Sequence, residues 1–505
     1  MYESPEPSTS VGVAPDLPPP LRKRFAAAAV SAMGVSALVL GLAFVRQMLI
    51  AAFFGISRAL DIYLMVYTIA AMTVFVFGFI FDAAAVPRLV QVRENKGEKA
   101  ARALSAGIFR LSCIIGLAAS AIMLAATPLL IPVIATGFQP NEKSELSRLV
   151  YYFLPWTLLC VPYYAAAARQ KGIRNFNRVF AAEVVICVVS IGVLLFWHSR
   201  IAYLPLAYAA GYGAGLLTLL PGSGVLSLAP GGSVLRTVLR NTGEQFLVNQ
   251  TSSLSNVADR HFQSLIPMGG IAAVNYATQA VNALATLVTF REIFIVPLAE
   301  TTRRTEKLER LVIGMLLLAV PVAVFTSLFS HEVVSVLFRR GNFDAGAVDV
   351  TSSVLRISAL ALVSSVINTP FLRMFQIIDR INLTHFVNLW SVVVISGFGY
   401  LFIGLLGLGA PGVAWMQLMN GVFTGIASVW IVARAGIVVR WWRIAGFVAF
   451  ALGTSGIAAV AARMVVSLLT DAGAWVELLC AGLIYCLVWG ACYFAAQTKL
   501  KPIFS

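Results

Sequence analysis

Long runs of apolar residues follow one another along almost the whole chain, and this pattern limits the fold more than any other feature. Each run is close to the roughly 20 residues that an α-helix needs to cross a bilayer. Only 12% of the 505 residues are charged, whereas a soluble chain carries about 25%. Such a chain cannot cover an aqueous surface. The sequence therefore predicts an all-α polytopic membrane protein without a soluble catalytic domain.

The apolar runs give about fourteen transmembrane helices. They lie near residues 26–46, 59–87, 104–135, 147–168, 179–197, 202–221, 242–266, 270–299, 311–337, 350–376, 384–405, 409–433, 443–469 and 474–496. Alternate loops are rich in Lys and Arg, for example around Lys96, Arg174 and Arg303. The positive-inside rule predicts that these loops and both termini are cytoplasmic.

The two halves of the chain resemble each other at an offset of about 205–215 residues, as in transporters built from repeats. The repeated positions are Arg46 with Arg260, Gly55 with Gly269, and Tyr63 with Tyr276. The repeat predicts two parallel bundles of about six helices, at 25–221 and 242–435, with a cytoplasmic linker at 222–241. Residues 1–24 are rich in proline and are predicted to form a disordered tail, and residues 436–505 add two further helices.

Ionisable residues inside membrane spans are costly and usually face a cavity or a partner. Most of them lie in the first two helices of each half. The candidates for binding an anionic substrate are Arg46, Arg260 and Arg291. The candidates for orienting these arginines, or for responding to a coupling ion, are Asp61, Asp259, Glu244 and Glu292.

Structural ion pairs are an equally open interpretation of these residues. The pairs to consider are Asp259 with Arg260, Arg291 with Glu292 or Glu244, and Arg46 with Asp61. Three further arginines are expected to extend toward the lipid headgroups without a functional role. These are Arg110, Arg356 and Arg463.

Signatures of enzymes are missing from the sequence. The six cysteines lie inside apolar runs without a CxxC pair, and the four histidines form no HExxH pattern. No Walker motif is present. We therefore expect no enzymatic activity and no cofactor, apart from a coupling ion whose identity the sequence leaves open. The net charge of +15 is spread over short clusters between spans, which favours contact with anionic membrane lipids over nucleic acid.

Four stretches carry a resemblance to a known family. They are "GLAFVRQMLIAAFFGISRALDIYLMVYTI", "FDAAAVPRL", "VADRHFQSLIPMGGIAAVNYA" and "VLFRRGNFDAGAV", the last being the most specific. Together with helix number and loop placement, they resemble the MurJ family of lipid II flippases, within the multidrug/oligosaccharidyl-lipid/polysaccharide exporter superfamily. The resemblance implies a V-shaped pair of bundles around a central cavity. It also implies that the substrate is an undecaprenyl-pyrophosphate-linked glycan, moved from the inner to the outer leaflet by alternating access.

The chain departs from the family at several cationic positions. Leu40 stands where the family has an arginine in the first helix, "AMTVFVFG" contains no arginine in the second helix, and Gln279 replaces one in the eighth. Arg46 remains, and guanidinium binds pyrophosphate well. The cargo is thus open between lipid II and an exopolysaccharide unit, with glycan polymerases or synthases as candidate partners. A small-molecule exporter of the same superfamily, and a non-transporting scaffold for glycan synthesis, are the alternatives.

Overall fold

The structure is a computed structural model, and it describes residues 19–81, 85–221, 251–289, 304–377, 383–434, 436–437, 439–468 and 473–504. Within these ranges all regular elements are helices, which confirms the predicted all-α class. Nine described helices are long and apolar enough to cross a membrane, or ten if the bent pair Ala345–Ser358 and Ala361–Leu372 is one span. Some predicted spans, such as 242–266 and 270–299, extend beyond the described ranges.

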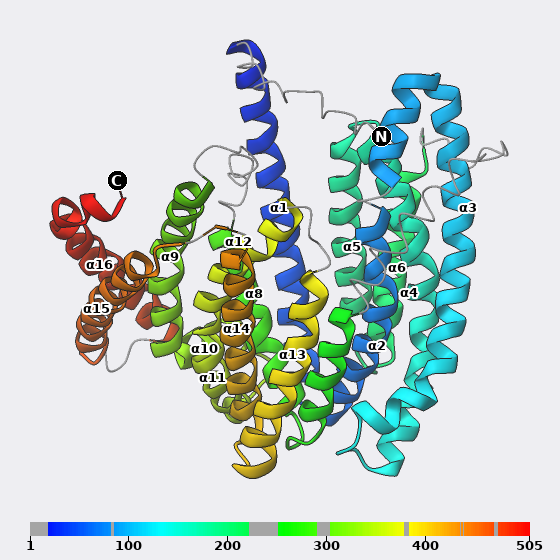
Figure 1. Cartoon of the computed structure of the whole chain (residues 1–505). Coiled ribbons are helices and arrows are strands. Elements are labelled where there is room, and N and C mark those ends of the chain that lie inside the picture. The colour runs from blue at the N-terminus through cyan, green and yellow to red at the C-terminus, as the bar shows by residue number, and fades with distance from the viewer. Residues whose placement is uncertain are drawn as a thin grey trace, which may run out of the picture.

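The helices of the first half pack against one another, with α2 to α6 at the right of Figure 1 and α1 near the middle. They are α1 (Pro19–Phe54), α2 (Arg58–Ile80), α3 (Val86–Ile134), α4 (Pro140–Gly172), α5 (Phe176–Phe196) and α6 (Tyr203–Leu219). Their contacts include α3 with α4, α5 with α6, and α1 with α5. Phe153 and Trp156 of α4 are fully buried among them.

The helices of the second half form another packed group (Figure 1). This group begins with a helix over 251–264 and continues with α8 (Gly270–Thr289), α9 (Arg304–Leu328), α10 (Ser330–Phe338), α11 (Ala345–Ser358), α12 (Ala361–Ile377), α13 (Leu383–Gly399), the π-helix η3 (Tyr400–Leu405) and α14 (Gly409–Arg434). The chain ends with α15 (Trp441–Val466) and α16 (Ala474–Phe504), which pack on each other and on α9.

Two predicted spans are broken rather than continuous. The span predicted at 311–337 is divided into α9 and α10 at Phe329, whose φ of −106° and ψ of 28° are not helical. The span predicted at 350–376 is divided into α11 and α12, which meet at an angle of 42°. Breaks of this kind occur in membranes where the freed backbone groups find partners within the protein. The Leu328 carbonyl finds one in Arg463, whose Nη2 donates to it at 2.7 Å.

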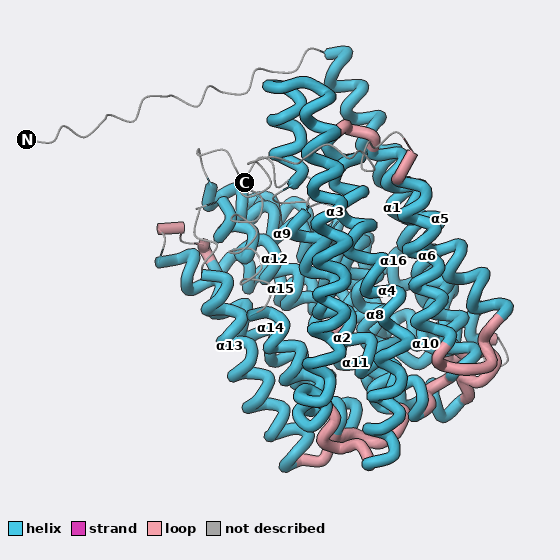
Figure 2. The backbone as a smooth tube through the Cα atoms, turned by 90° about the vertical axis from the view of Figure 1, so that its right-hand side faces the viewer, coloured by secondary structure: helices cyan, strands magenta, loops and turns pink. Residues whose placement is uncertain are grey.

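A bend in α3 marks one end of the molecule. Gly97 has φ of 79° and ψ of 177°, so the helix changes direction there. The bend stands at the upper end of the molecule in Figure 1, and the start of α1 and the end of α16 point toward the same end. The loop between α3 and α4 and the loop between α10 and α11 lie at the opposite end, which we call the distal end (Figure 2).

Local sequence signals explain where two helices begin at the distal end. Pro140 occupies the first turn of α4, where its missing N–H costs nothing, and the Gln139 N–H donates to the Glu142 carboxylate at 2.8 Å. At the start of α11, the Asp344 carboxylate accepts from the Ala347 N–H at 2.8 Å. Both arrangements satisfy backbone donors that a helix start leaves without partners.

The predicted domain boundaries fall partly outside the described residues. This applies to the linker predicted at 222–241 and to most of the tail predicted at 1–24. The first helix begins at Pro19, inside the predicted tail, because proline is compatible with the first turn of a helix.

Two ion pairs and a hydrogen bond attach the C-terminal hairpin, α15 and α16, to the second half. Arg440 donates to buried Glu309 through its backbone N–H at 2.7 Å and through its guanidinium at 3.0–3.3 Å. Near the other end of α15, Arg463 pairs with Glu332 of α10, so it does not extend to the headgroups as the sequence predicted. Between them, the Tyr485 hydroxyl donates to the Pro321 carbonyl at 2.9 Å. The hairpin is therefore attached to the second half at three points along its length.

Candidate functional site

The two halves of the chain contact each other at the distal end, in a region that we call the distal seal. It comprises residues 52–61, 133–138, 261–276 and 341–342. The Asn342 N–H donates to the Ala52 carbonyl at 2.8 Å, and its side-chain amide donates to the Phe53 carbonyl at 2.6 Å. His261 Nδ1 donates to the Val133 carbonyl at 2.7 Å. Backbone oxygens thus accept several of the bonds that cross the seal.

Glycines occupy matching positions of the seal in the two halves. Gly341 has φ of 57° and packs against the Ala52 carbonyl, so a Cβ at this position would overlap that oxygen. Gly137, its counterpart in the repeat, packs in the same way against the Ser264 carbonyl. Each half therefore presents a glycine loop to the end of the first helix of the other half. Such exchange is expected for repeats that a twofold axis relates.

Asp61 joins α2 to the start of α8 across the seal. Its fully buried carboxylate accepts from the Gly269 N–H at 2.6 Å and from the Ala272 N–H at 2.9 Å. A carboxylate at this place satisfies unpaired N–H groups and interacts favourably with the helix dipole. Among the described residues, Asp61 makes no ion pair with Arg46 or Arg260. These two hydrogen bonds fasten the halves together, and Arg58 lies 3.8 Å from the same carboxylate within the first half. The role of Asp61 in orienting an arginine of the site or in ion coupling stays a prediction.

Arg46 lies in α1 and faces α5 and α6. Its Nη1 donates to the Ser190 hydroxyl at 3.2 Å, and its guanidinium carbon stands 4.3 Å from the centre of the Tyr208 ring. Its buried Nε has no hydrogen-bond partner in the described part of the chain, and no described carboxylate lies within ion-pair distance. The cation is thus held by a hydroxyl and an aromatic face.

Arg260 and Asp259 are linked through an amide and do not touch directly. Arg260 Nη1 donates to the Gln263 side-chain oxygen at 2.5 Å, and the Gln263 amide donates to Asp259 at 2.8 Å. The Gln417 amide of α14 lies 3.3 Å from both Asp259 oxygens. Asp259 therefore belongs to a polar network inside the second half. Arg260 and Arg46 both lie within electrostatic range of Tyr67 of α2, which lines the seam between the two halves.

The other predicted site residues cannot be placed. Glu244, Arg291 and Glu292 lie outside the described residues.

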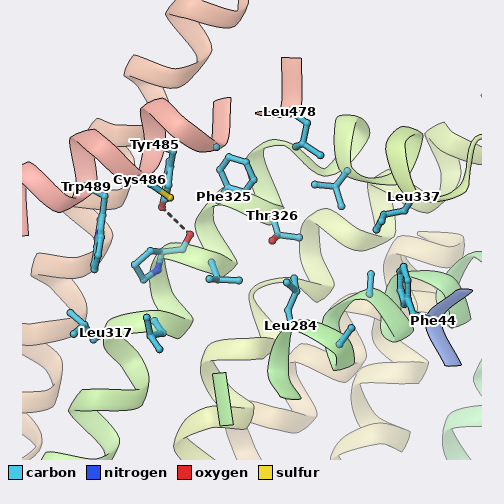
Figure 3. A pocket seen from close by; sticks show the side chains of 17 residues that line it. Phe44, Leu284, Leu317, Phe325, Thr326, Leu337, Leu478, Tyr485, Cys486 and Trp489 are labelled. Carbon is cyan, nitrogen blue, oxygen red and sulfur yellow. Dashed lines mark hydrogen bonds between the residues drawn. The ribbon is translucent and has the colours of Figure 1, made fainter. Parts of the chain in front are cut away.

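Two apolar grooves open along the seam, on either side of it. The first has a volume of about 520 Å³ and lies between α9, α10 and α16, with Phe44 of α1 and Leu284 of α8 at its edge (Figure 3). The second, of about 780 Å³, lies between α2, α3 and the helix over 251–264, and His385 borders it. Both grooves are of a size that holds part of a lipid chain.

One protein-family model matches the chain. The model described as "Lipid II flippase MurJ" matches residues 50–483, which is most of the sequence. The chain belongs to the lipid II flippase MurJ family. It is accordingly a polytopic membrane transporter of lipid-linked glycan, as the resemblance of the seal segments around Arg46 and Gly341 implied.

Solved structures share the fold of this MurJ-family protein at low sequence identity. A structure titled "Lipid II flippase MurJ, inward closed conformation" has a TM-score of 0.72 at 16% identity, over 92% of this chain and 99% of the other. An inward-facing multidrug resistance MATE transporter of the MOP superfamily has a TM-score of 0.59 at 16% identity, over 81% and 98%. A MOP superfamily transporter from Pyrococcus furiosus has a TM-score of 0.54 at 17% identity, over 80% and 93%. No sequence among the curated proteins matches the chain.

Several polar residues between the two halves were not among the site residues that the sequence predicted. Tyr63 and Tyr67 are four residues apart and share a face of α2, and this spacing was a usable signal. Gln263 follows Asp259 at the same spacing. Arg58 gave no such signal, because its bidentate partner Glu142, at 2.7 and 2.8 Å, is 84 residues away in sequence.

Proposed function

We propose that this MurJ-family protein moves an undecaprenyl-pyrophosphate-linked glycan from the inner to the outer leaflet of the bacterial cytoplasmic membrane. In this proposal the end with the α3 bend and both termini faces the cytoplasm, and the distal seal faces outward. The closed distal seal then belongs to the state that receives cargo from inside. Alternating access requires the seal to open while the cytoplasmic side closes.

The observation that carries the proposal is the environment of Arg46. A guanidinium inside a membrane protein without a described carboxylate partner favours binding of an anion. Its planar fork of donors matches phosphate oxygens. Arg260 lies at the same seam and supplies a second positive charge. Organic cations, the cargo of the rival small-molecule exporter, would be repelled by this pair.

The groove in Figure 3 is the part of the protein that we propose contacts the polyprenyl tail of the cargo. Its walls are apolar, and its edge at Phe44 reaches α1, the helix that carries Arg46. Lipid chains gain little from moving out of a bilayer into an equally apolar groove. The groove is therefore proposed to guide the tail while the pyrophosphate supplies the affinity.

Coupling and partners belong to the same proposal. Asp259 is the acidic group that we place in coupling, since only amides donate hydrogen bonds to it among the described residues. Asp259→Asn is expected to leave cargo binding intact and to slow transport. The expected protein partners are glycan polymerases or synthases that use the cargo at the outer face, and co-purification from membranes tests this.

The deciding experiment concerns Arg46. Arg46→Ala is expected to abolish flipping of lipid-linked glycan in proteoliposomes at normal protein levels, and Arg46→Lys is expected to restore part of it. Arg200→Ala removes an exposed arginine and serves as the control. Two lipids should be compared, lipid II and a lipid-linked exopolysaccharide unit. Full flipping by Arg46→Ala would refute the proposal.

The exchange Arg46→Asp with Asp61→Arg tests the alternative that these two residues form only a structural pair. The exchange puts a cation against the N-terminus of α8, where the helix dipole repels it. We expect no rescue. Restored transport would instead favour the structural pair.

A further inference from the structure

A small polar cavity lies between the two halves, at the inner border of the distal seal. Its volume is about 30 Å³. Its polar lining residues, which we call the amide–tyrosine cluster, are Gln47 of α1, Asn275 and Gln279 of α8, Tyr63 and Tyr67 of α2, and Tyr208 of α6. Both halves of the repeat therefore contribute to one site.

The three amides of the cluster lack protein partners. Gln47, Asn275 and Gln279 form no hydrogen bond with any other residue that the structure describes. Each amide offers two N–H donors and a carbonyl acceptor. The three residues are half-buried, so water occupies these hydrogen-bonding positions until a ligand displaces it. Asn275 and Gln279 are four residues apart on α8, so they present their amides from one helix face.

The chemistry of the cluster suits a neutral, hydroxyl-rich ligand. No charged side chain lines the cavity, so it offers an anion no counter-charge. Side-chain amides donate to and accept from neighbouring hydroxyl groups at the same time. Tyrosine rings supply flat apolar faces with a polar edge. A sugar ring, with hydroxyls at its rim and C–H groups on its faces, matches both kinds of group.

The position of the cluster indicates which sugar of the cargo lies beside it. Tyr208 belongs to the cavity and also carries the Arg46 guanidinium on its ring. Tyr67 belongs to the cavity and lies within electrostatic range of Arg46 and Arg260. The neutral cluster is therefore in direct contact with Arg46. In the cargo, the first sugar is bonded directly to the pyrophosphate.

We propose that the amide–tyrosine cluster binds this first sugar and so selects the cargo by its glycan, an inference that rests on the proposed function. A cavity of about 30 Å³ has room for about one water molecule. The sugar therefore binds when α1 and α8 move apart, and the cluster closes behind it. Arg46 and Arg260 bind the pyrophosphate that every such lipid shares.

Binding of two lipids to the full-length protein in nanodiscs tests the proposal. One is undecaprenyl pyrophosphate, and the other is the same lipid carrying a single N-acetylhexosamine. Gln279→Ala and Asn275→Ala are expected to weaken binding of the sugar-bearing lipid about tenfold, the effect of losing one or two hydrogen bonds. Binding of the sugar-free lipid should stay unchanged. Arg46→Ala should weaken both.

Controls separate the possible outcomes. Asn141→Ala removes an exposed amide of α4 and should change neither affinity, and Asn275→Asp provides a variant of nearly identical shape should the alanine variant fail to fold. If Gln279→Ala and Asn275→Ala bound the sugar-bearing lipid as tightly as the wild-type protein does, the cavity would hold only water, and the inference would be overturned. Equal losses for both lipids would assign the cluster to the pyrophosphate and overturn it too. If the wild-type protein bound neither lipid, the proposed function itself would fail.

Discussion

Asp61 and Asp344 are both carboxylates that accept from the N–H groups of a helix start, but only Asp61 does so across the two halves. Asp61→Asn removes the charge and leaves one amide oxygen for two donors. Hydrogen bonds to charged groups contribute about 1.5–3 kcal/mol. We therefore expect the population with an open seal to rise about tenfold. Distances between spin labels at Glu145 and Asp349, in a background without native cysteines, measure this population.

Asp344→Asn is the matched control for that experiment. It weakens the start of α11 within the second half and crosses no interface. The variant should lose some thermal stability and keep the wild-type distance distribution. If both variants opened the seal equally, general loosening of the protein would explain the result, and the fastening role of Asp61 would be wrong.

At the scale of single residues, the sequence did not predict which groups contact each other. The sequence indicated that Arg46 and Asp61 are functional, because charged groups are rare inside spans. It did not indicate that Asp61 binds the backbone of α8, whose Gly269 is 208 residues away. The helical period determines which residues share a face, whereas the rotation and height of each helix come from packing. Arg46 was therefore identified, but its contact with Tyr208 was not.

At the scale of elements, the loop before α11 closes the seal with a glycine. Gly341→Ala adds a Cβ where φ is 57° and the Ala52 carbonyl blocks the space. Gly407→Ala meets the same backbone strain at φ of 59° without any atom within 4 Å. The strain alone costs about 1–2 kcal/mol. Both variants should be less stable, but Gly341→Ala alone should lengthen the distance between the labels and reduce flipping.

The attachment of the C-terminal hairpin gives another prediction. Glu309→Ala removes the acceptor of four hydrogen bonds from Arg440. Because Arg440 is 45% exposed and regains water, we expect a loss of about 2 kcal/mol, below the 3–5 kcal/mol of a fully buried pair. Hydrogen exchange at the start of α15 should rise accordingly.

Glu306→Ala, one turn earlier in α9, is the control for this variant. Its pair with Arg310 is a surface pair within one helix, a type that contributes about 0.3–0.5 kcal/mol. Exchange in α15 should remain at the wild-type level. The same rate in both variants would mean that Glu309 does not hold the hairpin.

A fixed hairpin moves with the second half, so the groove along α16 keeps its shape while its edge at Phe44 changes.

At the scale of the whole molecule, topology is the first prediction to test. The basic loop around Lys96 is expected to face the cytoplasm. In a protein without native cysteines, Lys96→Cys should resist a membrane-impermeant reagent added to intact cells, and Asp349→Cys at the distal end should react. Labelling in the opposite pattern would invert the proposed direction of transport.

Much of the architecture was predictable from the sequence, because membrane spans are set by local length and polarity. The all-α class and the family followed from apolar runs and from the segments around Arg46 and Gly341. The breaks at Phe329 and between α11 and α12 did not. Their sequences remain apolar throughout, and the partner of the freed Leu328 carbonyl, Arg463, belongs to a helix 135 residues further on.

The exchanged glycine loops of the distal seal have a consequence for the ion gradients across the membrane. Gly341 rests on the end of α1, and Gly137 rests on the end of the helix over 251–264. If each half moves as a rigid body, both loops leave their contacts in the same movement. Passage of a bulky headgroup then needs no intermediate with a partly open pore. The membrane can keep its proton and sodium gradients while large polar molecules cross it.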